Sequence, residues 1–160
     1  MLSYRMPTTQ DVLLFFNWAN DEEVRSQSFS SQKINYEDHA KWFSARLEDE
    51  CCLLLIFQKE ERIDIGQIRI EKVNAGESII GISISSEFRG FGYATEMLKQ
   101  ASELFLKKNP AFKINAYIKK SNLPSKYAFE NAGFEFMEML NYENFESFHY
   151  VKKRDENREI

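Results

Sequence analysis

Apolar residues recur along this chain at two spacings, and the spacing separates strands from helices. Residues 79–84 are apolar and β-branched except at Gly81 and Ser83, a pattern typical of a buried strand. In residues 94–105 the apolar positions instead follow the period of a helix and form one face. The members of that face are Ala94, Met97, Leu98, Ala101, Leu104 and Phe105. A strand, a short turn and a helix are therefore predicted over residues 78–106.

The same two patterns divide the rest of the chain into short elements. Helices are predicted at 11–19, 36–47 and 123–131, and residues 20–25 allow one more short helix. Six further strands are predicted at 2–6, 52–58, 63–72, 113–118, 134–140 and 148–152. This order predicts an α+β fold in which helices cover a central mixed sheet.

Composition limits what kind of protein this is. With 160 residues, 43% of them hydrophobic and fourteen of them Phe, the chain is expected to form a single domain, 1–160, ending in a charged tail at 153–160. The net charge of −4 argues against nucleic acid as a partner, and the apolar runs are too short for a membrane span. Cys51 and Cys52 are adjacent, which does not suggest a disulfide framework, so we expect a cytoplasmic protein.

The turn from Arg89 to Ala94 carries the candidate chemistry. Gly90 and Gly92 permit positive φ and close approach of a ligand, and the helix that follows begins with unpaired N–H groups that attract anions. An ordinary tight turn needing small residues explains the hexapeptide equally well. The turn lacks the Lys-Ser/Thr pair of a P-loop and the third glycine of a dinucleotide fingerprint.

Two motifs together resemble the GNAT acetyltransferase superfamily. Arg89, Gly92 and Ala94 match the defined positions of its Gln/Arg-x-x-Gly-x-Gly/Ala loop. Downstream, 122–134 resembles the family's Asn-x-x-Ser/Ala-x-x-x-Tyr-Glu-x-x-Gly-Phe segment. The resemblance covers roughly residues 2 to 153. It implies a mostly antiparallel seven-stranded sheet flanked by about four helices, with acetyl-CoA as cosubstrate and no metal.

The resemblance also implies where acetyl-CoA binds. The strands at 79–84 and 113–118 would splay apart to admit it. Backbone N–H groups would hold its pyrophosphate, and the preceding strand would bind the pantetheine arm and polarise the acetyl carbonyl. Asn122 and Ser125 match cofactor-contacting positions, although Asn122 can equally be a helix cap, and the cations Arg89 and Lys126 can meet phosphates or stay solvated. The full expected set is Ile82, Ser83, Ile84, Arg89, Gly90, Phe91, Gly92, Tyr93, Ala94, Asn122, Ser125 and Lys126.

The catalytic groups depart from the family pattern at one position. Phe129 stands where the family often has a Tyr that protonates the thiolate. His39 is our first candidate for the base, since a histidine near its ordinary pKa accepts a proton at neutral pH. Its alternative is a half-buried histidine on a helix flank. Glu71 is the second candidate, with an exposed strand-end charge as its alternative, and His149 is interpreted as structural.

The acceptor is indicated by two N-terminal segments. Residues 16–26 and 34–43 resemble nucleotide-amino-sugar N-acetyltransferases, such as those on the pathway to pseudaminic acid, although Ala19 replaces their usual Arg. A nucleotide diphosphate would need cations, which Arg25, Lys33, Arg46, Arg69 and Lys72 offer. The expected substrate-binding residues are Asn20, Arg25, His39 and Trp42. Alternatives are a ribosomal-protein-type peptide acetylase and a non-catalytic acyl-CoA-binding module. A monomer or a homodimer is expected.

Overall fold

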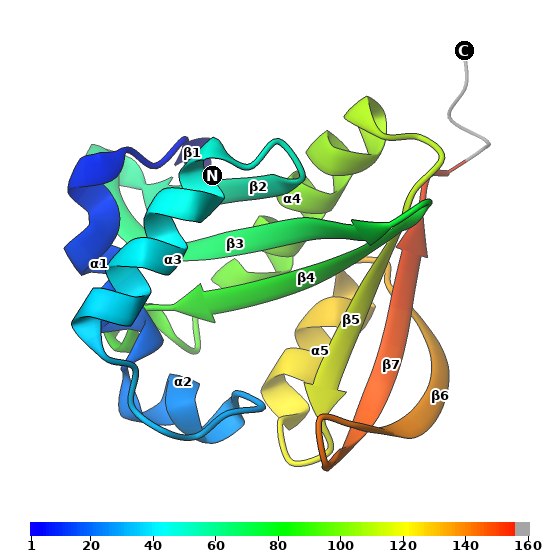
Figure 1. The fold of residues 1–160 in the computed structure, drawn as a ribbon. Coiled ribbons are helices and arrows are strands. Elements are labelled where there is room, and N and C mark those ends of the chain that lie inside the picture. Colours follow the sequence, from blue (N-terminus) through cyan, green and yellow to red (C-terminus); the bar gives the residue numbers. More distant parts are fainter. Residues whose placement is uncertain (156–160) are drawn as a thin grey trace.

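A seven-stranded sheet forms the centre of the computed structural model, which describes residues 1–155 (Figure 1). Every neighbouring pair of strands is antiparallel except β4 and β5, which run parallel, so the prediction of a mixed, mostly antiparallel sheet is confirmed. In their order across the sheet, the strands are β1 (Ser3–Arg5), β2 (Cys52–Lys59), β3 (Ile63–Asn74), β4 (Glu77–Ile84), β5 (Lys113–Lys119), β7 (Phe145–Lys153) and β6 (Glu135–Tyr142).

Helices cover both faces of this sheet. Helices α1 (Val12–Ala19) and α3 (Tyr36–Glu48) lie on one face, and α4 (Tyr93–Lys108) and α5 (Leu123–Asn131) lie on the other (Figure 1). The short helix allowed after residue 20 also forms, as α2 (Glu22–Gln27). It begins where the Asp21 side chain accepts a hydrogen bond from the Val24 N–H, an ordinary N-cap. The described residues therefore contain five α-helices rather than about four.

Strand β2 separates the two hydrophobic cores. Leu55 and Phe57 face the larger core beneath α4 and α5, whereas Leu54 and Ile56 face the smaller core beneath α1 and α3. Successive side chains of a strand point to opposite faces. A central strand covered on both sides must therefore be apolar throughout, which is why residues 52–57 form an unbroken apolar run.

The parallel pair β4–β5 is short. Its register runs only from Glu77↔Lys113 to Ile79↔Asn115, and two side-chain bonds fasten it there: Ser78 Oγ donates to the Lys113 carbonyl over 2.7 Å, and Asn115 Nδ2 donates to the Ser78 carbonyl over 3.0 Å. Beyond this point residues 80–84 have no ladder partner in β5. The two strands thus part, as the family resemblance implied.

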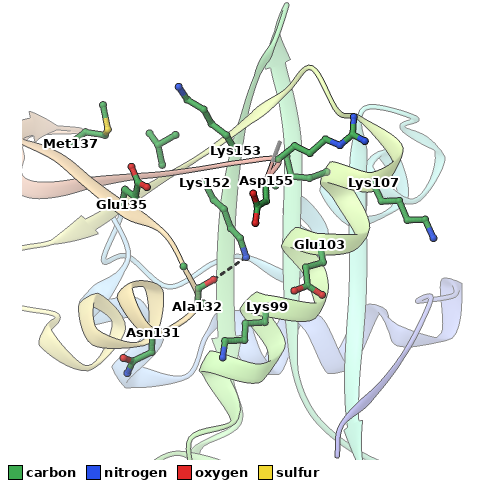
Figure 2. A pocket seen from close by; sticks show the side chains of 14 residues that line it. Lys99, Glu103, Lys107, Asn131, Ala132, Glu135, Met137, Lys152, Lys153 and Asp155 are labelled. Atoms are coloured by element: carbon green, nitrogen blue, oxygen red, sulfur yellow. Dashed lines mark hydrogen bonds between the residues drawn. The ribbon is translucent and has the colours of Figure 1, made fainter. Parts of the chain in front are cut away.

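Strand β7 ends one residue into the predicted tail. Lys153 is the last residue of β7, and Lys152 is tied down, since its Nζ donates to Ser102 Oγ over 2.8 Å and to the Ala132 carbonyl at the end of α5 over 2.9 Å. Figure 2 shows this lysine reaching across the hollow between α4, α5 and β7. Residues 156–160 of the predicted tail lie outside the described part of the chain. No helix among residues 1–155 combines the length and apolar character needed to cross a membrane.

Gly66 supplies a direct test of how tightly β3 and β4 are packed. A Cβ at this position would lie 2.4 Å from the Ser83 carbonyl oxygen, which belongs to the backbone of β4 and cannot move alone. We expect Gly66→Ala to lower the free energy of unfolding by about 1–3 kcal/mol, the usual cost of overpacking, as measured by urea denaturation.

Gly81→Ala is the matched control. Its Cβ would lie 3.1 Å from Nη2 of Arg69, the end of a flexible side chain that can move aside. Its loss of stability should therefore be clearly smaller. Equal losses in the two variants would contradict this account of the packing.

Candidate functional site

The turn before α4 is an open set of backbone donors. Gly90 and Gly92 have φ of 84° and 80°, values that favour glycine, and no atom lies within 4 Å of where a Cβ would stand on either. Gly92 is the N-cap of a 16-residue helix and offers no side-chain cap. The first N–H groups of α4 therefore remain available to an anion, favoured by the helix dipole.

The side chain of Arg89 is committed within the fold. Its guanidinium bonds Asp21 over 2.7 Å and Glu23 over 2.8 Å, and its Nε donates to the Ile84 carbonyl over 3.1 Å. It thereby joins α2 to the end of β4. Arg89 would have to release two carboxylates before it could meet a phosphate, so only its backbone remains a direct candidate for anion binding.

The side chains of residues 82–84 are also committed, which leaves the backbone of β4 for ligand binding. Ile82 and Ile84 pack against the larger core. Ser83 lies on the opposite face, where its Oγ accepts a hydrogen bond from Gln67 Nε2 over 2.9 Å. The peptide groups that face the gap toward β5 are the part of this strand that an extended ligand could bind.

Helix α5 contributes a cap and a buried aromatic ring. Asn122 Oδ1 accepts from the Ser125 N–H over 3.4 Å, so the cap interpretation of Asn122 holds, and contact with a cofactor stays a prediction. Lys126 pairs with Glu130 over 3.0 Å one turn further along the helix. Phe129 is 3% exposed and lies edge-on to Phe134, with ring centroids 5.0 Å apart. The position of the family's tyrosine is thus part of the core.

His39 lies in the core rather than on a helix flank. It is 3% exposed, and its ring lies among those of Phe16, Trp42 and Phe43, at centroid distances of 5.5, 5.6 and 6.2 Å. Residues i and i+4 share one helical face, so His39 belongs to the inward stripe of Phe43. Burial lowers the pKa of His39, and its Nε2 has no hydrogen-bond partner. A group so enclosed has no direct access to an acceptor amine.

Glu71 lies within a cluster of charges. Its Oε1 is 2.9 Å from Arg69 Nε and 3.3 Å from Arg46 Nε. Both guanidiniums lie over the ring of Trp42, at 5.5 Å for Arg69 and 5.7 Å for Arg46. Glu71 would have to give up these partners to act as a base. Trp42, which was predicted to bind substrate, belongs to this same cluster on the α3 side of the sheet.

Asn20 and Arg25 organise the segment between α1 and α3. Asn20 makes two hydrogen bonds with the backbone of Ile34, of 2.9 and 2.7 Å. Arg25 donates to the carbonyls of Ala19 and Ser30, over 2.6 and 3.1 Å, and burial lowers its pKa. Both side chains are therefore engaged by their own loop, and a role in substrate binding stays a prediction for them.

Three strands beyond β4 carry an aromatic and polar group whose contacts the sequence did not reveal. Tyr117 on β5 stacks on Tyr142 of β6 at 4.0 Å and on His149 of β7 at 4.7 Å. Asn115 Oδ1 accepts from His149 Nε2 over 2.8 Å, since the Asn115 amide nitrogen donates to Ser78 and Glu77. The alternation in 113–118 was a usable signal, because it places Asn115 and Tyr117 on one face.

No group of three or more His, Cys, Asp and Glu side chains in the described part of the chain is arranged to hold a metal ion. Two features of the structure are open to a ligand. One is the set of open N–H groups at the start of α4, and the other is the gap between β4 and β5 that leads to it.

The sequence of this chain matches a known protein family. The family model described as an acetyltransferase (GNAT) domain matches residues 2–135. The chain belongs to this family of acetyltransferases, which confirms the superfamily that the two motifs indicated. Among curated protein sequences, none matches the chain significantly.

Two solved structures illustrate the shared fold. An aminoglycoside acetyltransferase in complex with coenzyme A is 19% identical, with a TM-score of 0.81, over 96% of this chain and 95% of that one. The spermidine N-acetyltransferase from Vibrio cholerae, in complex with coenzyme A and spermine, is 16% identical, with a TM-score of 0.84, over 94% of each chain. At these identities the likeness establishes the fold, and the acceptor must be argued from this chain.

The two histidines predict a pH dependence of stability. Burial lowers the pKa of both His39 and His149 below the ordinary value of about 6.5, so below that pH the unfolded chain binds more protons than the folded one. The free energy of unfolding should therefore fall between pH 7 and pH 5, by at most about 1.4 kcal/mol per pH unit for each histidine. Urea denaturation at several pH values measures this slope.

His39→Leu should reduce that slope, because it removes one of the two titrating groups. His149→Gln removes the other and is the matched comparison. An unchanged slope in His39→Leu would mean that His39 is not held neutral in the folded protein. Asp11 does not interfere, because Arg5 lowers its pKa from 3.8 and it titrates well below this window.

Proposed function

We propose that this protein transfers an acetyl group from acetyl-CoA to the primary amine of a small molecule. The observation that carries the proposal is the parting of β4 and β5 after Ile79↔Asn115, together with the uncapped start of α4 at the end of the same strand. A pantetheine arm needs unpaired strand backbone, and a pyrophosphate needs convergent N–H donors. Both are present, in that order, along one continuous segment.

In the proposed reaction the backbone supplies most of the binding. The N–H groups of residues 89–94 receive the pyrophosphate, and those of residues 80–84 that face β5 bind the pantetheine. One N–H of this strand donates to the acetyl oxygen, where negative charge develops as the amine attacks. The donors of residues 80–84 belong to a strand that pairs with β3 along its length, so they are in place before the reaction begins.

The chemical step needs an attacking amine in its neutral form. Its lone pair forms the C–N bond at the carbonyl carbon, the C–S bond breaks, and the sulfur leaves with the electron pair. The nitrogen then loses one proton to become a neutral amide, and the thiolate gains one to become the thiol of coenzyme A. Because His39 is enclosed and two arginines bind Glu71, we propose that water carries these protons. Phe129 has no hydroxyl and lies in the core, so it supplies none.

The acceptor we favour is the amino group of a nucleotide-linked amino sugar. The resemblance of residues 16–26 and 34–43 to enzymes of that type supports it. The solved structures that share the fold include complexes with spermine and with kanamycin, so polyamines and aminoglycosides are the competing amines. Cys51 and Cys52 are both free thiols, which supports the reducing cytoplasm as the place of action.

The test is release of free thiol from acetyl-CoA against a panel of amines. The panel contains nucleotide-linked amino sugars, aminoglycosides, polyamines and short peptides with free N-termini. Turnover of one small amine supports the proposal, and turnover of peptides alone contradicts it. Binding of acetyl-CoA without turnover of any amine would instead identify a non-catalytic acyl-CoA-binding module.

Gly92→Glu tests the predicted pyrophosphate site. Its carboxylate would stand beside the open N–H groups of α4. Two like charges about 4 Å apart repel by roughly 1–4 kcal/mol. We expect the affinity for coenzyme A, measured by calorimetry, to fall by about tenfold or more.

Gly92→Gln is the matched control, because it has the same size and the same unfavourable φ without the charge. The difference between the two variants isolates the electrostatic effect. Equal affinities of the Glu and Gln variants for coenzyme A would show that no phosphate lies at the start of α4.

A further inference from the structure

Of the five cations named as partners for an anionic acceptor, the structure leaves few available. Arg25 is engaged by backbone carbonyls of its own loop, and Lys72 lies over the ring of Phe112, with Nζ 5.0 Å from its centroid. Lys33 is exposed on the loop between α2 and α3. Arg46 and Arg69 alone come together, around Glu71 and Trp42. These two arginines are therefore the candidates for binding an anionic group of the acceptor.

Arg69 is held in place on three sides. Its Nε bonds Glu71 over 2.9 Å, its guanidinium lies over Trp42, and below it Gly81 provides room on β4. A Cβ at Gly81 would lie 3.1 Å from Nη2 of Arg69. The absence of a side chain at this position in the middle of a strand thus leaves room for the guanidinium close to the backbone of β4.

The terminal donors of Arg69 remain free. Its side chain is 35% exposed, and neither Nη1 nor Nη2 has a hydrogen-bond acceptor among residues 1–155. Arg46, by contrast, places Nη1 3.6 Å from Asp49. A guanidinium whose Nε pairs with a carboxylate, and whose two Nη groups have no acceptor of their own, can bind a phosphate or carboxylate through both of them.

The position of Arg69 relates these donors to the reaction. Arg69 is the direct partner of Gly81 in the β3–β4 ladder, and Gly81 follows Ile79, where β4 parts from β5, by two residues. Arg69 therefore lies beside the strand segment at which we place acetyl transfer.

We propose that Arg69 binds an anionic group of the acceptor, so that the substrate is an amine that also carries a phosphate or a carboxylate. Trp42 and Glu71 are positioning residues that hold the guanidinium in place, and Gly81 leaves the room that it occupies. The inference rests on the proposed acetyl transfer and makes it more specific. It excludes polyamines, whose only charges are positive, as the preferred acceptors.

The experiment compares matched acceptors that differ only in the anion. One pair is glucosamine and glucosamine 6-phosphate, and a second is a nucleotide-linked amino sugar and the same free sugar. A third pair, an amino acid and its amide, distinguishes carboxylate from phosphate as the recognised group. The wild-type enzyme should favour the anionic member of one pair in kcat/KM by about 10- to 150-fold, the range for a hydrogen bond to a charged group.

Arg69→Gln should remove this preference and leave the neutral acceptor within about threefold of wild type, because only the anion loses its partner. Lys72→Gln is the matched control, since it removes one positive charge from the same strand at a side chain that packs on Phe112. Arg69→Lys should retain a smaller preference, because an ammonium is a point charge without the two-pronged geometry. Urea denaturation of the three variants checks that folding is unchanged.

Each outcome bears on the proposal. Loss of the preference in Arg69→Gln alone supports it, whereas equal losses in Arg69→Gln and Lys72→Gln would reduce it to a general effect of charge and overturn it. A wild-type preference for polyamines or neutral amines would overturn it and leave acetyl transfer intact. If no amine is turned over, acetyl transfer itself fails. Calorimetry with the same anionic compounds then still decides whether Arg69 binds them, and no binding to wild type overturns the inference.

Discussion

The short parallel contact between β4 and β5 is the constraint on which the rest of this structure depends. Three residue pairs, fastened by Ser78 and Asn115, hold the two halves of the sheet together. A longer ladder would satisfy the backbone of β4 internally and leave nothing for a ligand, whereas without the ladder the halves would be joined by side-chain packing alone. The hydrogen bonds at residues 77–79 keep the sheet continuous, and their absence beyond Ile79 leaves an open strand edge in the middle of the sheet.

The elements around this point place backbone donors and side-chain charge on opposite faces of the sheet. On one side, Gly92 begins α4 without a cap, and Arg89 is withdrawn into its bonds with Asp21 and Glu23, so the backbone alone faces an incoming anion. On the other side, Arg69 is fixed on Trp42 and Glu71 with its outer donors free. In this proposal peptide groups bind the anion of the cofactor, and an arginine side chain binds the anion of the acceptor.

Local pattern was sufficient for the fold because each element carries its own signal. The apolar run at 52–57, the helical stripe at 94–105 and the caps at Asn35 and Asn122 depend on neighbours within one or two turns of chain. The backbone part of the candidate site was predictable for the same reason, since the glycines at 90 and 92 and the helix after them are consecutive. The roles of His39, Glu71 and Arg89 depend in part on residues 23 to 68 positions away, which no periodicity reveals.

The sequence by itself determined the class of this protein: two motifs in order, on a β-α pattern of one domain's length, predicted an acetyltransferase fold with an anion-binding turn. Tertiary structure alone decided which ionisable groups are available. It enclosed His39 among aromatic rings, bound Glu71 between Arg46 and Arg69, and turned Arg89 toward α2. The physical reason is that backbone conformation follows from local sequence, whereas burial and ion pairing follow from which distant side chains the fold brings together.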